Sequence, residues 1–167
     1  TLGGRVRPVS LELLGQARML APMVDAGVEA VLIGHRAREH AAELTAYGAD
    51  CVHLADAPGL DHYDTELYTG VLAEAVTEHH PYAVLIPATV NGRDLAARLA
   101  ARLGLDLTGD CIGLEIDDQG RLVQLKPAFG DSIVAPILST TMPQMATVRP
   151  GIFSEVRPDS SIAPIIN

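Results

Sequence analysis

Helical segments alternate with short apolar runs along this chain, which predicts a three-layer α/β domain with a mostly parallel sheet and helices on both faces. Three aliphatic runs have the length of buried strands, and amphipathic segments separate them. Parallel strands joined through helices need right-handed crossovers, which place those helices on the faces of the sheet. An apolar fraction of 48% with 20% charged residues in 167 residues is sufficient for one aliphatic core.

The helices and parallel strands are expected between residues 10 and 104, where apolar positions recur at helical spacing between strand-like runs. Ser10 is expected to cap the first helix, which Gly27 ends, and Asn91 is expected to cap the last, which Gly104 ends. The predicted strands are 28–33, 51–54 and 83–86, and the predicted helices are 10–24, 36–47, 65–78 and 91–103.

An antiparallel hairpin is expected after the last helix, because the period of the apolar residues changes there from helical to alternating. Residues 111–116 form its first strand, a turn at 117–120 follows, and residues 121–125 return. The side chains expected to share one face are those of Ile112, Leu114 and Ile116.

Two short strands near the carboxyl end complete the predicted fold, at residues 133–138 and 145–149. Pro136 lies inside the first of them and has no amide hydrogen to donate. An edge position is therefore expected for that strand.

Residues 1–153 are expected to form one amino-terminal domain that lacks its first strand. Alternating α/β folds usually have a strand before the first helix, often in the centre of the sheet, and none precedes Ser10. Residues 154–167 include Pro158 and Pro164 and have the composition of a linker toward a further domain.

Charge and cysteine content exclude several classes of partner and site. A formal net charge of −9 repels phosphate backbones, so no nucleic-acid partner is expected. Cys51 and Cys111 form no Cys-x-x-Cys pair, which favours two buried thiols in a reducing compartment. No apolar run approaches the roughly 18 residues of a membrane span. We expect a cytoplasmic location without membrane insertion, or the mitochondrial matrix for a eukaryotic source.

Several sequence blocks together resemble the alpha subunit of electron-transfer flavoproteins, in that family's order and over nearly the whole chain. The most specific is the helix Gly-Arg-Asp-Leu-Ala-Ala-Arg-Leu-Ala-Ala-Arg-Leu at 92–103. In the block at 126–132, Asp131 and Ser132 stand where the family usually has Gly-Asn. The similar blocks are 8–18, 47–50, 62–69, 92–103, 126–132 and 143–151.

The resemblance implies an adenine-nucleotide-hydrolase-like fold and a heterodimer with a beta subunit. Block 62–69 is similar to the bacterial branch that serves acyl-CoA dehydrogenases in fatty acid beta-oxidation. The resemblance therefore implies electron transfer from such dehydrogenases to a quinone-reductase-type acceptor. It also implies that FAD binds in a carboxy-terminal domain beyond Asn167, so no catalytic or flavin-contacting residue is assigned here and the chain is no enzyme by itself.

The loop formed by Asn91, Gly92 and Arg93 is a candidate ligand site, because open α/β sheets place ligands at the carboxyl ends of their strands. A phosphate could bind there. A structural interpretation is favoured, with Asn91 as cap, Gly92 as turn former and an ion pair between Asp94 and Arg98.

Two enzyme-like patterns in the sequence lack the partner residues that catalysis or metal binding requires. Gly130-Asp131-Ser132-Ile133 matches the nucleophile block of Gly-Asp-Ser-Leu esterases, yet no histidine follows Ser132 to act as its base. Among the histidines only His79 and His80 are close in sequence, and neighbouring helix residues point in different directions. No metal site is therefore predicted.

Arg149, in a terminal strand between Val148 and Pro150, is the candidate interface residue. A buried ion pair and an ordinary surface position are the alternatives for its side chain. For the whole chain, the alternative function is a stand-alone adenine-nucleotide-binding domain resembling universal stress proteins, although neither Gly-x-Gly-x-x-Gly nor Gly-x-x-x-x-Gly-Lys occurs.

Overall fold

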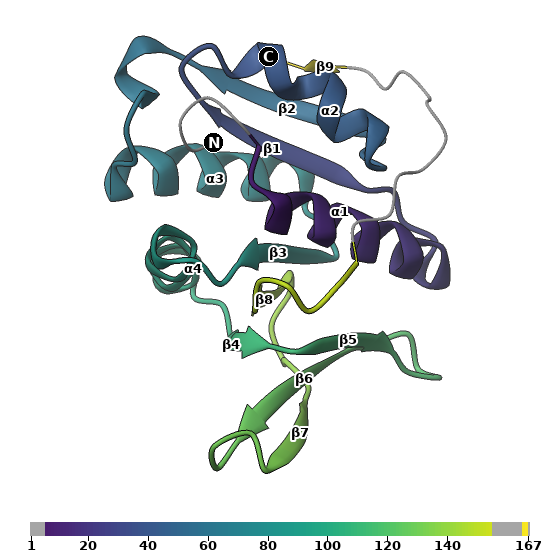
Figure 1. Cartoon of the computed structure of the whole chain (residues 1–167). Helices are drawn as coiled ribbons and strands as arrows, with labels where there is room; N and C mark the ends of the chain where they lie inside the picture. Colours follow the sequence, from purple (N-terminus) through teal and green to yellow (C-terminus); the bar gives the residue numbers. More distant parts are fainter. Residues whose placement is uncertain (1–5, 155–164, 167) are drawn as a thin grey trace.

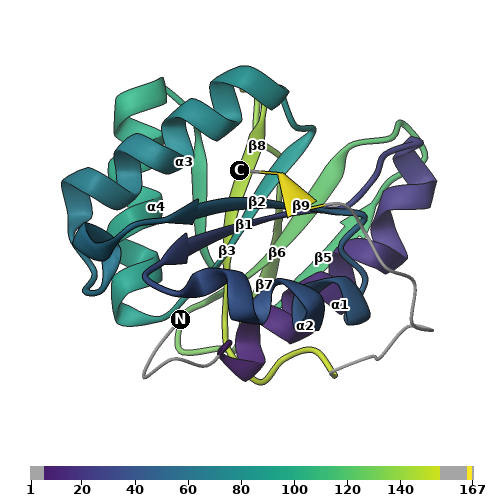
Figure 2. The ribbon, with the colours of Figure 1, turned by 90° about the horizontal axis from the view of Figure 1, so that it is seen from above.

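The computed structural model describes residues 6–154 and the backbone of residues 165–166. Within them the predicted α/β architecture is confirmed, with helices on both faces of parallel strands and an antiparallel sheet beside them. Figure 2 shows α1 (Pro8–Leu20) and α2 (Ala41–Ala46) on one side of the strands, and α3 (Thr65–His79) and α4 (Val90–Leu103) on the other.

The parallel strands form two separate sheets. In the first, β1 (Glu29–Gly34) pairs with β2 (Cys51–Asp56), and β2 pairs with β9 (Ile165–Ile166), all in parallel. In the second, β8 (Gln144–Val148) lies between β3 (Ala83–Pro87) and β4 (Leu107–Cys111), again in parallel. The three predicted strands of the first half are therefore confirmed in place and direction.

The antiparallel sheet has the order β5-β6-β7, formed by β5 (Gly113–Ile116), β6 (Leu122–Ala128) and β7 (Ile133–Ile137). The predicted hairpin is confirmed, with Leu114 opposite Gln124 and Ile116 opposite Leu122. Pro136 does lie in an edge strand, whereas β8 is central. Figure 1 shows this sheet at the end of the molecule farthest from α2 and β2.

Three details of the sequence interpretation were wrong at helix ends and strand bounds. Helix α1 begins at Pro8, because proline suits a first turn in which the amide hydrogen has no partner. Thr89, and not Asn91, caps α4, since its hydroxyl oxygen accepts a hydrogen bond from the Gly92 amide at 3.1 Å. Cys111 ends β4, a strand that the sequence interpretation missed, and does not begin the hairpin.

Three clusters of buried aliphatic side chains hold these elements together. One joins α1 and α2 to β1 and β2, and a second joins α3 and α4 to β3 and β8. The third includes Leu13 of α1, Leu114 of β5 and Val148 of β8, and so connects the antiparallel sheet to the parallel strands. The Gln16 side-chain amide adds a buried hydrogen bond to the Leu114 carbonyl at 3.2 Å.

The predicted linker at 154–167 lies almost wholly outside the described residues. Of it, Ile165 and Ile166 add the short strand β9 to the free edge of β2.

Candidate functional site

The candidate interface residue Arg149 lies at the centre of an ion cluster. Its Nη2 and Nε atoms donate to one oxygen of Asp110 at 2.8 and 3.2 Å, and its Nη1 reaches Asp131 at 3.3 Å. Asp110 sits at a bulge at the end of β4 with φ of 62°, and its amide donates to the Thr147 hydroxyl at 2.9 Å. The cluster therefore connects β4, β8 and the turn between β6 and β7.

The predicted ligand loop at Asn91, Gly92 and Arg93 is instead the first turn of α4, because Thr89 caps that helix. Its Arg93 reaches the same cluster, with Nη2 3.5 Å from the second oxygen of Asp110, so this turn and Arg149 meet through one carboxylate. Hydrogen bonds from Arg149, with the charges of Arg149, Arg93 and Lys126, lower the pKa of Asp110 below its ordinary value. No local sequence pattern connects these two candidate sites, because their residues lie more than 50 positions apart in the chain.

Close packing explains Gly92. The charge of Arg98 acts on Asp94 as expected, but both side chains make their direct contacts with other residues. A Cβ at position 92 would lie 1.9 Å from the Pro87 carbonyl oxygen, so α4 can approach the end of β3 this closely only with glycine. Asp94 accepts hydrogen bonds from the hydroxyls of Tyr63 and Thr65, each at 2.6 Å. These hydrogen bonds, together with the charge of Arg98, lower the pKa of Asp94. The Arg98 Nη1 atom lies 3.8 Å from the Glu66 Oε1 atom.

The turn between β6 and β7 carries an exposed apolar surface beside the ion cluster. Phe129 and Asp131 adopt positive φ angles of 50° and 64°, and Phe129 is 83% exposed. Successive strand residues point to opposite faces, yet Ile133 and Val134 are 54% and 47% exposed. Neither face of β7 is covered at this point. We call Phe129, Ile133, Val134 and Leu138 the β7 surface.

Ser132, the serine of the esterase-like block, is exposed in this turn. Its amide donates to the Phe129 carbonyl oxygen at 3.4 Å, which gives the residue a role in the turn.

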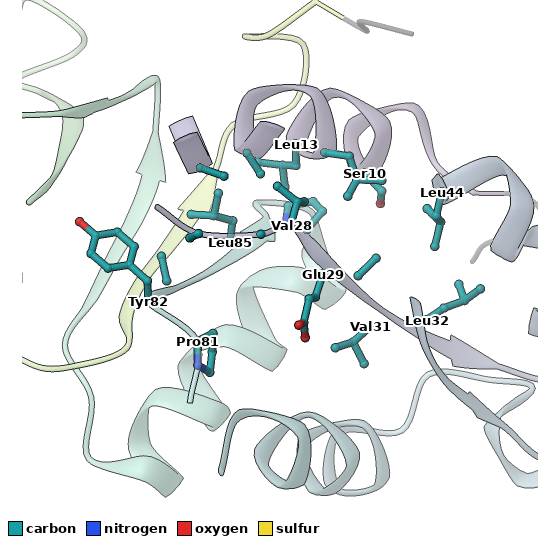
Figure 3. Close-up of a pocket in the computed structure, with 18 of the residues that line it drawn as sticks. Ser10, Leu13, Val28, Glu29, Val31, Leu32, Leu44, Pro81, Tyr82 and Leu85 are labelled. Atoms are coloured by element: carbon teal, nitrogen blue, oxygen red, sulfur yellow. The ribbon is translucent and has the colours of Figure 1, made fainter. Parts of the chain in front are cut away.

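A cavity of about 550 Å³ separates the two parallel sheets, bounded by β1, β3 and α1. Figure 3 shows aliphatic side chains of β1 and α1, among them Val31, Leu32 and Leu13, together with Leu85 of β3. The lining is largely aliphatic, with Ser10, Glu29 and His79 among its few polar residues. Such a cavity suits an apolar occupant better than a nucleotide phosphate.

Both cysteines are free and buried, as the sequence interpretation expected. Burial raises the pKa of the Cys111 thiol to about 11. Burial and the nearby Glu29 carboxylate also raise the pKa of the Cys51 thiol.

A second polar cluster lies where α3 ends against β1 and β2. His53 Nε2 is 2.6 Å from a carboxylate oxygen of Glu29, and the rings of His53 and His79 have centroids 4.2 Å apart. The sequence places only His79 and His80 close together and does not predict this group, because its members come from three different elements.

Among the described residues, no helix has both the length and the apolar character needed to cross a bilayer.

Comparisons with known proteins place the chain in a family. The model of the electron transfer flavoprotein domain matches residues 1–166. The chain is similar to the electron transfer flavoprotein subunit alpha of Thermoanaerobacterium thermosaccharolyticum, at 43% identity over 98% of this chain and 50% of the relative. It is also similar to the LctC subunit of a lactate dehydrogenase (NAD(+),ferredoxin) from Acetobacterium woodii, at 43% identity over 90% of this chain and 36% of the relative.

Protein FixB of Rhizobium meliloti is 40% identical over 90% of this chain and 44% of its own length. The chain thus spans about half the length, or less, of these relatives. The family match covers nearly all residues of this chain, and several alpha subunits are similar to it. This chain therefore belongs to the electron transfer flavoprotein domain family, and within that family it is related to the alpha subunits.

Proposed function

We propose that this chain is the non-flavin domain of an electron-transfer flavoprotein alpha subunit and that its role is to bind the beta subunit. The observation that carries the proposal is the β7 surface, which leaves apolar side chains exposed on both faces of an edge strand. Exposed apolar groups gathered beside ordered charges are typical of protein interfaces.

Arg149 supports this surface by holding the turn that precedes it. Its ion pair with Asp131 fixes a residue of the turn at positive φ, and its ion pair with Asp110 anchors the turn to β4. In this proposal Arg149 orders the β7 surface before the partner binds, which lowers the entropy cost of association.

The assembled protein carries electrons from a dehydrogenase, such as an acyl-CoA dehydrogenase, to a quinone-reductase-type acceptor. FAD binds in the part of the parent protein outside this chain, and the chain by itself is an electron-carrier domain and not an enzyme. The LctC relative is a subunit of a lactate dehydrogenase, so a lactate-oxidising partner is the alternative electron donor. The proposed location is the cytoplasm.

We further propose that the cavity between β1 and β3 is the position of the strand expected before α1. The facing edges of β1 and β3 belong to different sheets, and the lining between them is mostly aliphatic, as a central strand requires. Fusing a short Val- and Ile-rich strand segment ahead of residue 1 should raise the melting temperature of the chain, whereas a Gly- and Ser-rich segment of equal length should not.

The interface is tested with the alpha subunit that contains this chain and with its beta subunit. The double variant Ile133→Lys/Val134→Lys should weaken heterodimer formation at least about tenfold, because charges would have to be desolvated at the interface. The matched control Met19→Lys/Met23→Lys adds equal charge at methionines that are 58% and 60% exposed elsewhere. Equal weakening by both variants, measured by titration calorimetry, would reject the β7 surface.

Cofactor content is measured separately on the purified chain. After mixing with excess FAD and desalting, visible absorbance should show no stoichiometric flavin. Retained flavin would move the flavin site into this domain, and stoichiometric ATP binding would favour the alternative of a stand-alone adenine-nucleotide-binding domain.

A further inference from the structure

Glu29, His53 and His79 bring three potential metal-ligand atoms together, all within 4.8 Å of one another. Glu29 pairs in register with Cys51 of β2, and His53 follows two residues later on the same face of that strand. His79 is the last residue of α3, which lies over this face. The group therefore depends on the β1–β2 register and on where α3 ends.

Cys51 lies beside His53 and is a fourth potential ligand, although its Sγ atom is outside the set of atoms that all lie within 4.8 Å of one another. Its Sγ atom lies 3.8 Å from His53 Nε2, close to the separation of about 3.5 Å expected for sulfur and nitrogen on one tetrahedral zinc ion. The other atoms need small movements, because two nitrogen or oxygen ligands on such an ion lie about 3.3 Å apart. Glu29 and His79 are exposed and can move by changing rotamer, whereas the His53 side chain is only 12% exposed and stays in place.

We propose that Glu29, His53, His79 and Cys51 form a structural zinc site. Two imidazoles, a thiolate and a carboxylate suit Zn²⁺, whereas Mg²⁺ and Ca²⁺ prefer oxygen ligands alone. On binding, zinc replaces the hydrogen bond between Glu29 and His53 Nε2, and the neutral His53 ring keeps its single proton on Nδ1. The Cys51 thiol releases its proton to the solvent. The bound ion joins the end of α3 to β1 and β2.

A metal-free interpretation accounts for part of this geometry. The contact between Glu29 and His53 is a short hydrogen bond, and the rings of His53 and His79 are stacked with an interplanar angle of 37°. It leaves unexplained why a cysteine, two histidines and a glutamate from three elements converge. The two interpretations differ in their response to a metal, which a direct experiment can measure.

The test uses the untagged chain, titrated with ZnCl₂ by calorimetry and then loaded with Co²⁺. We expect one zinc ion to bind per chain and to raise the melting temperature. The visible absorption bands of the Co²⁺ form should have the high intensity that is typical of tetrahedral coordination. His53→Ala and His79→Ala should each weaken zinc binding by at least about a hundredfold, since even outer-shell losses cost about ten- to a hundredfold. His79 is exposed at a helix end, so its removal should leave the circular dichroism spectrum unchanged.

The matched control is His62→Ala, which removes a histidine with a 95% exposed side chain outside the cluster. It should leave the zinc affinity unchanged. Cys51→Ser should remove the near-ultraviolet charge-transfer band of the cobalt form, and an unchanged band would overturn the assignment of the fourth ligand. Zinc binding that is equal in the wild type, His53→Ala and His79→Ala would overturn the site as a whole.

Discussion

Strands β7 and β8 are both five residues long and both lie in the last quarter of the chain, yet their environments are opposite. All five residues of β8 are buried, and it lies between β3 and β4 beneath the helices. Three of the five residues of β7, an edge strand, are exposed, including Ile133 and Val134. Apolar character alone therefore does not decide burial, because the number of neighbouring strands and the presence of a covering layer decide it.

The largest expected effect separates these two strands directly. Met145→Ala in β8 removes a fully buried side chain and should lower the free energy of unfolding by about 2–5 kcal/mol. Ile133→Ala in β7 should change it much less, by about 0.5 kcal/mol, because Ile133 is 54% exposed. Urea unfolding of both variants measures the difference, and similar costs would show that β7 is buried in solution.

The second effect tests how closely α4 packs on the parallel sheet. Gly92→Ala should lower the free energy of unfolding by about 1–3 kcal/mol, because the new methyl group would overlap the Pro87 carbonyl oxygen and force α4 away from β3. Gly70→Ala in α3 is the matched control, where the added methyl group meets no atom within 4 Å. That variant should gain up to about 1 kcal/mol from helix propensity. A neutral Gly92→Ala variant would contradict the close packing.

The smallest effect concerns the ion cluster that connects β8 to the turn before β7. The pKa of Asp110 is lower in the folded chain than in the unfolded chain. Its carboxylate therefore stabilises the fold above the ordinary carboxyl pKa of about 4, and this stabilisation is lost as the pH falls through the pKa of the folded state. Asp110→Asn should lower the free energy of unfolding by no more than about 1 kcal/mol at neutral pH, because the ion pair between Asp110 and Arg149 is partly exposed.

The pH dependence distinguishes this cluster from a general surface effect. The stability difference between wild type and Asp110→Asn should narrow as the pH is lowered from about 5 toward 2, because the wild-type carboxylate then becomes protonated. Asp118→Asn, which removes one charge at an exposed position of the hairpin turn, is the control for the loss of charge and is measured over the same pH range. A difference that stays constant with pH would indicate that Asp110 acts through packing and not through its charge.

The sequence by itself determined the elements that local pattern encodes. The strands at 28–33, 51–54 and 83–86 follow from aliphatic runs of strand length, and the hairpin follows from alternation around a polar turn. The edge position of β7 follows from Pro136, which cannot donate a hydrogen bond.

Only the tertiary structure decided which segments far apart in the chain meet. The insertion of β8 between β3 and β4, the meeting of Arg93 and Arg149 at Asp110, and the convergence of Glu29, His53 and His79 all depend on strand order and register. Side-chain periodicity shows which face of an element is apolar, but it contains no information on which distant element will cover that face.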